Sequence, residues 1–296
     1  MSTHPQESKP MNQPHKTQTL YVTDLDGTLL QDDATLSGRS RDILLELLAD
    51  GLPLTVATAR SVASFRPILQ ELPLKLPVIE FNGAFLSDFS TGKHHFVRAL
   101  KPHLVADILE LIRAQGVQPY LATYGERDNL FCPPSQNAGM EWFVKERQES
   151  DDPRLRLVDD VQCGVAEQVV CVTLIGDEAM THRVHAELSS RWGAMLQLYH
   201  WPHDSSPAHW LTIQDVKVTK ARAVDELVHR IGTKDCEVTA FGDQINDIEM
   251  LSSADRGIAV ANATAELRAL ATQVIGSNTE DSVAQFLRRD WADTAR

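Results

Sequence analysis

The chain has 296 residues, of which 43% are hydrophobic and 23% are charged, as is typical of a soluble globular protein. Its formal net charge of −13 disfavours nucleic acids and anionic membranes as partners. No apolar run is long enough to cross a bilayer and the polar segment 1–18 carries no secretion signal, so we expect a cytoplasmic protein with a disordered leader at 1–18.

The first part of the chain alternates strands with helices. Helical spacing of apolar residues begins after Ser37, a good N-cap, and ends at Gly51, a good helix stop. The pattern predicts strands at 19–23, 53–57 and 76–81 and helices at 37–51 and 61–72. This alternation is typical of right-handed crossovers in a parallel α/β sheet.

The middle part of the chain loses this alternation. Hairpin-like pieces joined through Thr91-Gly92 are followed by helical patterns and β-rich runs. The pattern predicts a hairpin of 84–89 with 94–100, helices near 101–115 and 177–191, and strands at 167–176, 196–201 and 208–214. We therefore expect an inserted α+β domain at 85–210.

The last part of the chain resumes the first pattern. It predicts helices at 218–232, 247–254, 264–271 and 280–291, with strands at 237–243, 257–261 and 273–276. We expect an α/β fold, in which 19–84 and 211–296 form a doubly wound, Rossmann-like parallel-sheet core that the inserted domain interrupts.

Polar side chains follow several predicted core strands, at the edge where an open α/β sheet forms its ligand crevice. They are Asp24, Asp26, Thr58 and Asp243, and Lys220 begins a later core helix. Asp-Gly alone is a common turn, and Thr58 or Lys220 alone is an ordinary strand-end or helix residue. The combination, in this order and at these strand ends, is what indicates a site.

Each of these residue types suits phosphoryl transfer. Asp24 can attack phosphorus and form an aspartyl phosphate, while Asp26, two residues on, can carry the proton. Asp24 and Asp243 can supply the oxygen ligands that Mg²⁺ prefers. Lys220 and Thr58 can bind the phosphoryl oxygens.

These residues resemble the motifs of the haloacid dehalogenase superfamily of phosphohydrolases. "DLDGTLL" (24–30) resembles the first motif, Thr58 in "VATAR" the second, Lys220 in "VTKARAV" the third and "GDQIND" (242–247) the fourth. The position of the insertion resembles that of members with an α/β cap of type C2. "FNGAFL" (81–86) is similar to the Cof-like, sugar-phosphatase-type branch.

The resemblance implies a role for each matching residue. Asp24 is the nucleophile, Asp26 the general acid and base, and Thr58, Lys220 and Asn246 bind the phosphoryl group. Mg²⁺ is bound by Asp24, Asp243 and the backbone carbonyl of Asp26, with Asp247 in support. Lys217, three residues before Lys220, remains an alternative phosphate lysine. Candidate substrate contacts are Arg60, Asn82 and the cap residues Tyr124, Arg127, Lys145 and Arg147.

We therefore expect a Mg²⁺-dependent phosphatase, monomeric or homodimeric, that hydrolyses a small phosphorylated metabolite such as a sugar phosphate through an aspartyl-phosphate intermediate. Two alternatives stay open. One is a phosphomutase or phosphotransferase of the same fold, and the other is a non-catalytic module resembling a response-regulator receiver.

Overall fold

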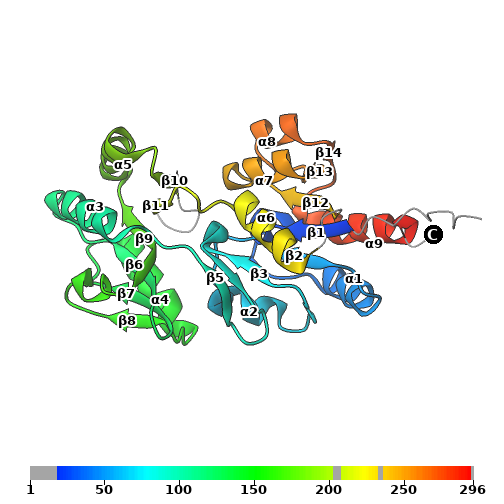
Figure 1. The fold of residues 1–296 in the computed structure, drawn as a ribbon, viewed down its shortest axis with the longest axis horizontal. Coiled ribbons are helices and arrows are strands. Elements are labelled where there is room, and N and C mark those ends of the chain that lie inside the picture. Colours follow the sequence, from blue (N-terminus) through cyan, green and yellow to red (C-terminus); the bar gives the residue numbers. More distant parts are fainter. Residues whose placement is uncertain (1–18, 203–207, 233–235, 295–296) are drawn as a thin grey trace, which may run out of the picture.

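The computed structural model describes residues 19–202, 208–232 and 236–294 (Figure 1). The expected leader at 1–18 lies outside the described residues. None of the helices in the described ranges is long and apolar enough to span a membrane. The described residues form three sheets. Two are large, with five and six strands, and a small sheet of three strands connects them.

The core sheet has five parallel strands in the order β14-β13-β12-β1-β2. Their bounds are β1 Thr19–Thr23, β2 Leu54–Val56, β12 Glu237–Gly242, β13 Arg256–Ala259 and β14 Gln273–Val274. Strands β1 and β12 come from the two ends of the chain and lie side by side at the centre of the sheet. Their residues are buried apart from the first two of β12, as expected for parallel strands covered on both faces.

Helices cover the two faces of the core sheet. They are α1 Gly38–Ala49, α2 Val62–Leu69, α6 Lys220–Ile231, α7 Ile248–Ser253, α8 Ala265–Leu270 and α9 Ser282–Thr294. Helix α1 packs against α9 and α6 packs against α7, on opposite sides of the sheet, which right-handed crossovers from a central β1 require. The predicted doubly wound α/β core is confirmed.

A small antiparallel sheet connects the two larger layers. It consists of β3 Val78–Glu80, β4 Phe85–Ser87 and β5 His94–Val97, and Ile79 of β3 also makes a parallel bridge to Ala57 after β2. The hairpin of β4 and β5 thus pairs with β3, the last strand of the first core segment. The domain boundaries at 84 and 85 stay a prediction.

The buried ring of His94 joins this small sheet to the inserted layer. Its Nδ1 lies 2.7 Å from Ser87 Oγ and its Nε2 lies 2.7 Å from Asp128 Oδ1. The Ser87 hydroxyl donates to the buried carboxylate of Glu80, and the His94 ring stacks on Phe85 with centres 4.0 Å apart. One imidazole therefore bonds two polar groups, one in each of two sheets.

The inserted layer is a six-stranded sheet in the order β10-β11-β9-β6-β7-β8. Its strands are β6 Tyr120–Tyr124, β7 Asp128–Cys132, β8 Leu155–Leu157, β9 Gln168–Gly176, β10 Leu196–Pro202 and β11 His209–Asp215. Helices α3 Pro102–Ala114 and α5 Glu178–Trp192 pack on one face through an apolar cluster, and α4 Ala138–Glu149 packs on the other. We did not predict α4 or β6–β8 from the sequence.

Candidate active site

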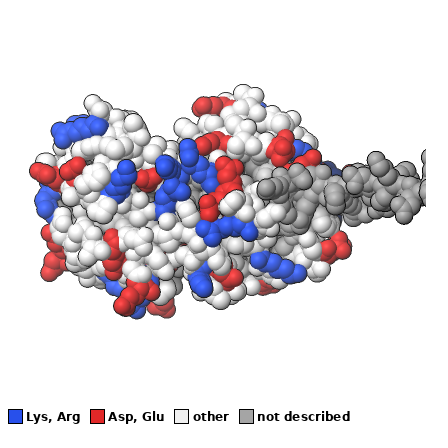
Figure 2. Space-filling model, in the orientation of Figure 1, with Lys and Arg blue, Asp and Glu red and all other residues white. Residues whose placement is uncertain are grey.

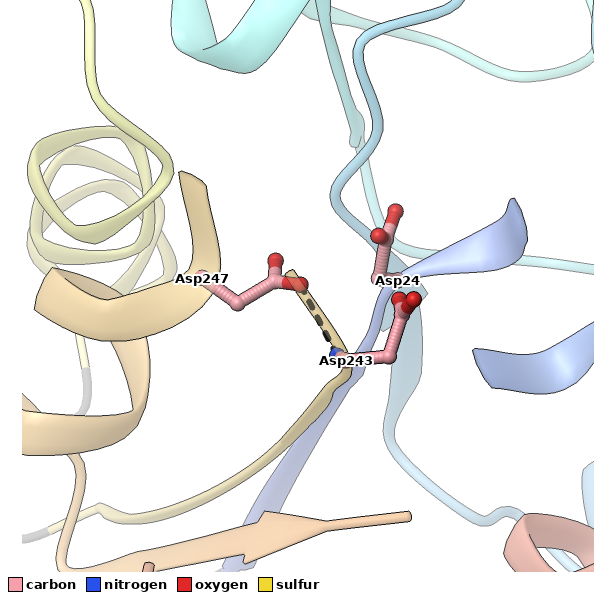
Figure 3. Close-up of side chains that lie close together, drawn as sticks. All are labelled: Asp24, Asp243 and Asp247. Atoms are coloured by element: carbon pink, nitrogen blue, oxygen red, sulfur yellow. Dashed lines mark hydrogen bonds between the residues drawn. The ribbon is translucent and has the colours of Figure 1, made fainter. Parts of the chain in front are cut away.

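Two neighbouring parallel strands bring three acidic residues together (Figure 3). Asp24 follows β1 and Asp243 follows β12, while Asp247 ends a short helical turn after β12. A carboxylate oxygen of each lies within 4.8 Å of those of the other two. Among the described residues, no other group of three or more His, Cys, Asp or Glu side chains gathers this closely.

A buried lysine neutralises part of this acidic group. Lys220, the first residue of α6, is completely buried, and its Nζ lies 2.9 Å from Asp24 Oδ1 and 2.6 Å from Asp247 Oδ1. Lys217 is exposed, and its backbone N–H donates to Asp215 Oδ1 at 2.9 Å. Of the two lysines that the sequence offers, Lys220 is the one that contacts the carboxylates.

Local hydrogen bonds fix the orientation of each carboxylate. Asp247 Oδ2 accepts from the backbone N–H groups of Asp243 at 3.0 Å and Gln244 at 3.1 Å. Thr28 Oγ1 donates to Asp243 Oδ1 at 2.8 Å, and the N–H of Leu25 is 2.7 Å from Asp24 Oδ1. These bonds come from rigid turns at strand ends, so the group is held in place before any ligand arrives.

Burial and mutual repulsion shift the ionisation of the group. Burial raises the pKa of Asp24, and Asp247 and Asp243 add to this effect while Lys220 opposes it. The pKa of Asp243 rises to about 7, chiefly through burial and then through the charge of Asp247. Burial disfavours the charged form of Lys220, but Asp24 and Asp247 outweigh it and raise the pKa of its ammonium group. The site is therefore short of positive charge.

The donor set fits a divalent cation with a preference for oxygen ligands. Three carboxylates face one ammonium group, and hard ions such as Mg²⁺ bind carboxylate oxygens. Gly27 preserves the space, because a Cβ at this position would collide with the carboxylate of Asp243, and its φ of +67° favours glycine. A cation at this site would supply the charge that the cluster lacks.

Asp26 stands apart from the buried group. Its side chain is 49% exposed, and both carboxylate oxygens bond Arg60, with Nε 2.7 Å from Oδ2 and Nη2 2.7 Å from Oδ1. Asp26 and Arg60 come from the loops after β1 and β2, which are neighbours in the sheet. The structure brings these two predicted site residues together as a bidentate ion pair.

Thr58 follows the last residue of β2 by two positions, at the start of the loop that holds Arg60. Its side chain is buried, with 1% of the residue exposed, and its Oγ1 accepts the N–H of Arg60 at 3.1 Å. The backbone N–H of Thr58 donates to the carbonyl of Ile79 at 3.0 Å. Because the hydroxyl proton has no acceptor among its contacts in the described chain, Thr58 can still donate a hydrogen bond.

The side chains of Asn82 and Asn246, which lie far apart in the sequence, contact each other. Asn246 Nδ2 donates to Asn82 Oδ1 at 3.1 Å, and Asn82 Nδ2 donates to Gln214 Oε1 at 3.3 Å. Gln214 is fully buried, and its Nε2 donates to the carbonyl of Phe81 at 2.8 Å. Asn82 has a positive φ of 56°, a backbone conformation that asparagine adopts more readily than most residues.

The sequence reasoning missed two residues of this site. Thr28, which donates a hydrogen bond to Asp243, lies in the same short segment as Asp24 and Asp26. The sequence pattern predicts no role for it. Gln214 lies near the end of strand β11, and a fully buried glutamine in a strand signals a specific hydrogen-bond partner.

Known proteins match this chain over nearly its whole length. A family model described as haloacid dehalogenase-like hydrolase matches residues 21–287. The 5-amino-6-(5-phospho-D-ribitylamino)uracil phosphatase YitU of Bacillus subtilis is 27% identical over 272 residues, 91% of this chain and 96% of that protein. The pyridoxal phosphate phosphatase YbhA of Escherichia coli is 28% identical over 281 residues, 92% of this chain and 98% of that protein.

Solved structures share the fold. A haloacid dehalogenase-like hydrolase from Bacteroides thetaiotaomicron superposes with a TM-score of 0.76 at 24% identity, covering 93% of this chain and all of that chain, 100%. TM0651 from Thermotoga maritima superposes with a TM-score of 0.75 at 23% identity, covering 92% of this chain and 97% of that chain. The likeness includes both the core and the inserted layer.

Proposed function

Because the chain belongs to the haloacid dehalogenase-like hydrolases and is a phosphoric monoester hydrolase, we propose that it hydrolyses a small phosphorylated metabolite through a phosphorylated Asp24. One observation carries the proposal. The carboxylate of Asp24 is held at the carboxyl edge of the parallel sheet, 2.9 Å from the ammonium group of Lys220 and beside two further buried carboxylates.

The first half of the reaction uses Asp24 as nucleophile. One of its carboxylate oxygens attacks phosphorus, and the bond between phosphorus and the leaving oxygen breaks. Asp26 gives a proton to the leaving oxygen. Lys220 and Thr58 bind the phosphoryl oxygens, and the amide of Asn246 contacts the same group or the substrate.

The second half releases phosphate. Asp26, now deprotonated, takes a proton from a water molecule, whose oxygen attacks the phosphorus and frees Asp24. In the structure Arg60 donates one hydrogen bond to each oxygen of this carboxylate, and each oxygen keeps a second lone pair that can take the proton. Arg60 thus sets the position from which Asp26 acts.

Asp24, Asp243 and the backbone carbonyl of Asp26 would hold Mg²⁺, with Asp247 in support. The cation would screen the repulsion between the substrate phosphate and the carboxylates. The raised pKa of Asp243, about 7, is consistent with a site built for a cation, since burial without one favours the protonated carboxyl.

The substrate is a small anion that enters where the inserted layer meets the core. Despite the net charge of −13, Figure 2 shows several Lys and Arg side chains on the viewed face near this junction, with Asp and Glu side chains beside them. Arg60 and Asn82 are our candidate substrate contacts. Relatives are named for a phosphoribitylamino uracil, for pyridoxal phosphate and for HMP-PP, so a screen should include phosphorylated heterocycles as well as sugar phosphates.

The test is hydrolysis of an aryl phosphate and of the screened metabolites with and without Mg²⁺. We expect release of inorganic phosphate that depends on Mg²⁺ and is abolished in Asp24→Asn. Asp33→Asn, in an exposed loop where the side chain bonds only Thr35, is the matched control and should keep full activity. Full activity of Asp24→Asn would contradict the proposal.

Product analysis separates hydrolysis from the alternatives. Transfer of the phosphoryl group to an added acceptor, with no inorganic phosphate, would indicate a mutase or phosphotransferase. A phosphorylated protein that persists without turnover would indicate a receiver-like module.

A further inference from the structure

Four histidines gather at the edge of the inserted sheet, and none of them belongs to the acidic group. They are His182 and His185 on α5, His200 on β10 and His209 on β11. The centre of the His200 ring lies 4.4 Å from that of His182, 6.0 Å from that of His185 and 5.4 Å from that of His209. His200 follows Leu198 by two residues in β10, so both face the side of the sheet on which α5 packs.

The hydrogen bonds of His200 fix its tautomer. Its Nε2 lies 2.9 Å from Thr181 Oγ1, and this hydroxyl lies 2.9 Å from the carbonyl oxygen of Asp177 and 3.1 Å from that of Glu178. A carbonyl only accepts, so the single hydroxyl proton of Thr181 goes to one of these carbonyls. His200 therefore donates through Nε2–H, and in the neutral ring its Nδ1 keeps a free lone pair.

His182 has the same kind of arrangement. Its Nδ1 lies 3.2 Å from the carbonyl oxygen of Glu178, so Nδ1–H donates and Nε2 carries the lone pair. His209 has a buried Nδ1 that meets no hydrogen-bond partner within the described ranges. Histidines that bind metals almost always donate their other ring N–H to a carbonyl or similar acceptor, as His182 and His200 do here.

The rings of His185 and His200 favour the neutral form that binds metals. Burial lowers the pKa of His185, and the neighbouring His182 lowers it further. Burial also lowers the pKa of His200, followed by the surrounding histidines, and Glu178 opposes them. Neutral imidazoles are ligands for Zn²⁺, Cu²⁺ and Ni²⁺, whereas the acidic group selects hard ions.

The spacing suits a shared ion. With zinc about 2.0–2.1 Å from each nitrogen, the centres of two rings on one tetrahedral ion lie about 5 Å apart, close to the 4.4 to 6.0 Å seen here. In the structure, the ring nitrogens of these histidines lie farther apart than the carboxylate oxygens of the acidic group. His182 is exposed and His185 is half-buried, and both line a cavity of about 530 Å³, so they have room to turn.

We propose that His182, His185 and His200 bind one transition-metal ion such as Zn²⁺, with His209 beside them. The ion would join α5 to the edge strand β10. It would lie in the cavity whose opposite wall is formed by the core residues Ile245, Asn246 and Glu249. In Figure 1, β10 is the edge of the inserted sheet nearest α7.

The test is a calorimetric titration of the full chain with Zn²⁺ in excess Mg²⁺, which occupies the acidic group. We expect one tight site per chain. His182→Ala and His200→Ala should each weaken binding by at least about tenfold, and Thr181→Val, which removes the bond that fixes the tautomer, by about tenfold. Titration with Co²⁺ should give visible absorption typical of nitrogen ligands in the wild type and not in His182→Ala.

His103→Ala, which removes an exposed histidine on α3, and Asp24→Asn should both keep the tight site. His182 is exposed, so its replacement tests the site even if a change at His200 alters β10. Equal binding by the wild type and His182→Ala would overturn the proposal, as would loss of the site in Asp24→Asn. Neither result depends on phosphatase activity.

Discussion

At the residue scale, the site separates two aspartates that have only Leu25 between them in the sequence. Asp24 is buried against Lys220, whereas Asp26 is half exposed and bonded to Arg60. The strand-end pattern, with the start of a later helix, predicts Asp24, Asp26 and Lys220 as parts of one site, whereas Arg60 enters only as a candidate substrate contact. The pairing of Asp26 with Arg60 was not predictable, because it depends on how two loops from neighbouring strands approach each other.

The ion pair of Asp26 and Arg60 gives a first prediction. Arg60→Ala should lower kcat/KM by about tenfold or more, because Asp26 loses its orientation, yet by less than the 10²–10⁴-fold that acid–base catalysis contributes. Arg41→Ala is the matched control, since Arg41 also pairs with a neighbouring aspartate, Asp42, but on the exposed surface. Steady-state kinetics of both variants test this prediction. Unchanged kinetics in Arg60→Ala would contradict the proposed role of Arg60 in orienting Asp26.

The raised pKa of Asp243 gives a prediction for stability. Its pKa rises from 3.8 to about 7 on folding, so the protonated carboxyl stabilises the fold at low pH. In the metal-free protein this stabilisation is lost as pH rises through about 7. In a chelator, the melting temperature should therefore decline as pH rises from 3.8 to about 7. Added Mg²⁺ should raise the melting temperature more at pH 8 than at pH 5.

Asp243→Asn provides the control for this prediction. The uncharged amide keeps an oxygen for the Thr28 hydroxyl and removes the buried charge. We expect the variant in chelator to melt at a higher temperature than the wild type at pH 8, and to gain little from Mg²⁺. A Mg²⁺ effect as large as that of the wild type would show that the cation binds elsewhere.

At the element scale, the core helices and strands followed their sequence patterns, whereas α4 and β6–β8 of the inserted layer were not predicted. The strand and helix alternation of the core was predictable because apolar residues recur with a clear period. Helix α4 was not, because it buries only Gly139, Met140 and Phe143 and its period is correspondingly weak. The packing of α4 against Tyr120 in the inserted sheet stabilises a helix whose own sequence pattern is weak.

The link through His94 gives a prediction at this scale. His94→Ala removes a ring that bonds Ser87 and Asp128 across two sheets, and should lower the free energy of unfolding by about 1–3 kcal/mol. His95→Ala is the matched control on the exposed side of the same strand, with an expected change within about 0.5 kcal/mol. Urea unfolding of both variants measures the difference, and equal values would show that the link contributes nothing.

At the scale of the whole molecule, the inserted layer has a core of its own. The apolar cluster under α3 and α5 draws all its members from residues 100–213. A second cluster, on the face of α4, also includes Phe85 and Val218 from outside the inserted sheet. The insertion was predictable from the break in the alternation, but the sharing of the second cluster with the β3–β5 sheet was not.

The self-contained cluster predicts that the segment 98–217 folds when expressed alone. We expect a cooperative urea transition with a lower free energy of unfolding than in the full chain, because the apolar face shared with Phe85 and Val218 becomes exposed. Circular dichroism and urea titration check this. Absence of a cooperative transition would show that the inserted layer does not fold independently of the core.

The hydrogen bond from Thr28 to Asp243 joins residues 215 positions apart, and this has a consequence for timing. During synthesis the first half of the site leaves the ribosome long before the second half exists. The entropy lost on closing such a loop grows only slowly with length, and an insert that has already folded shortens the loop further. We therefore expect activity to appear late in the life of the nascent chain, once the final core strands have been made.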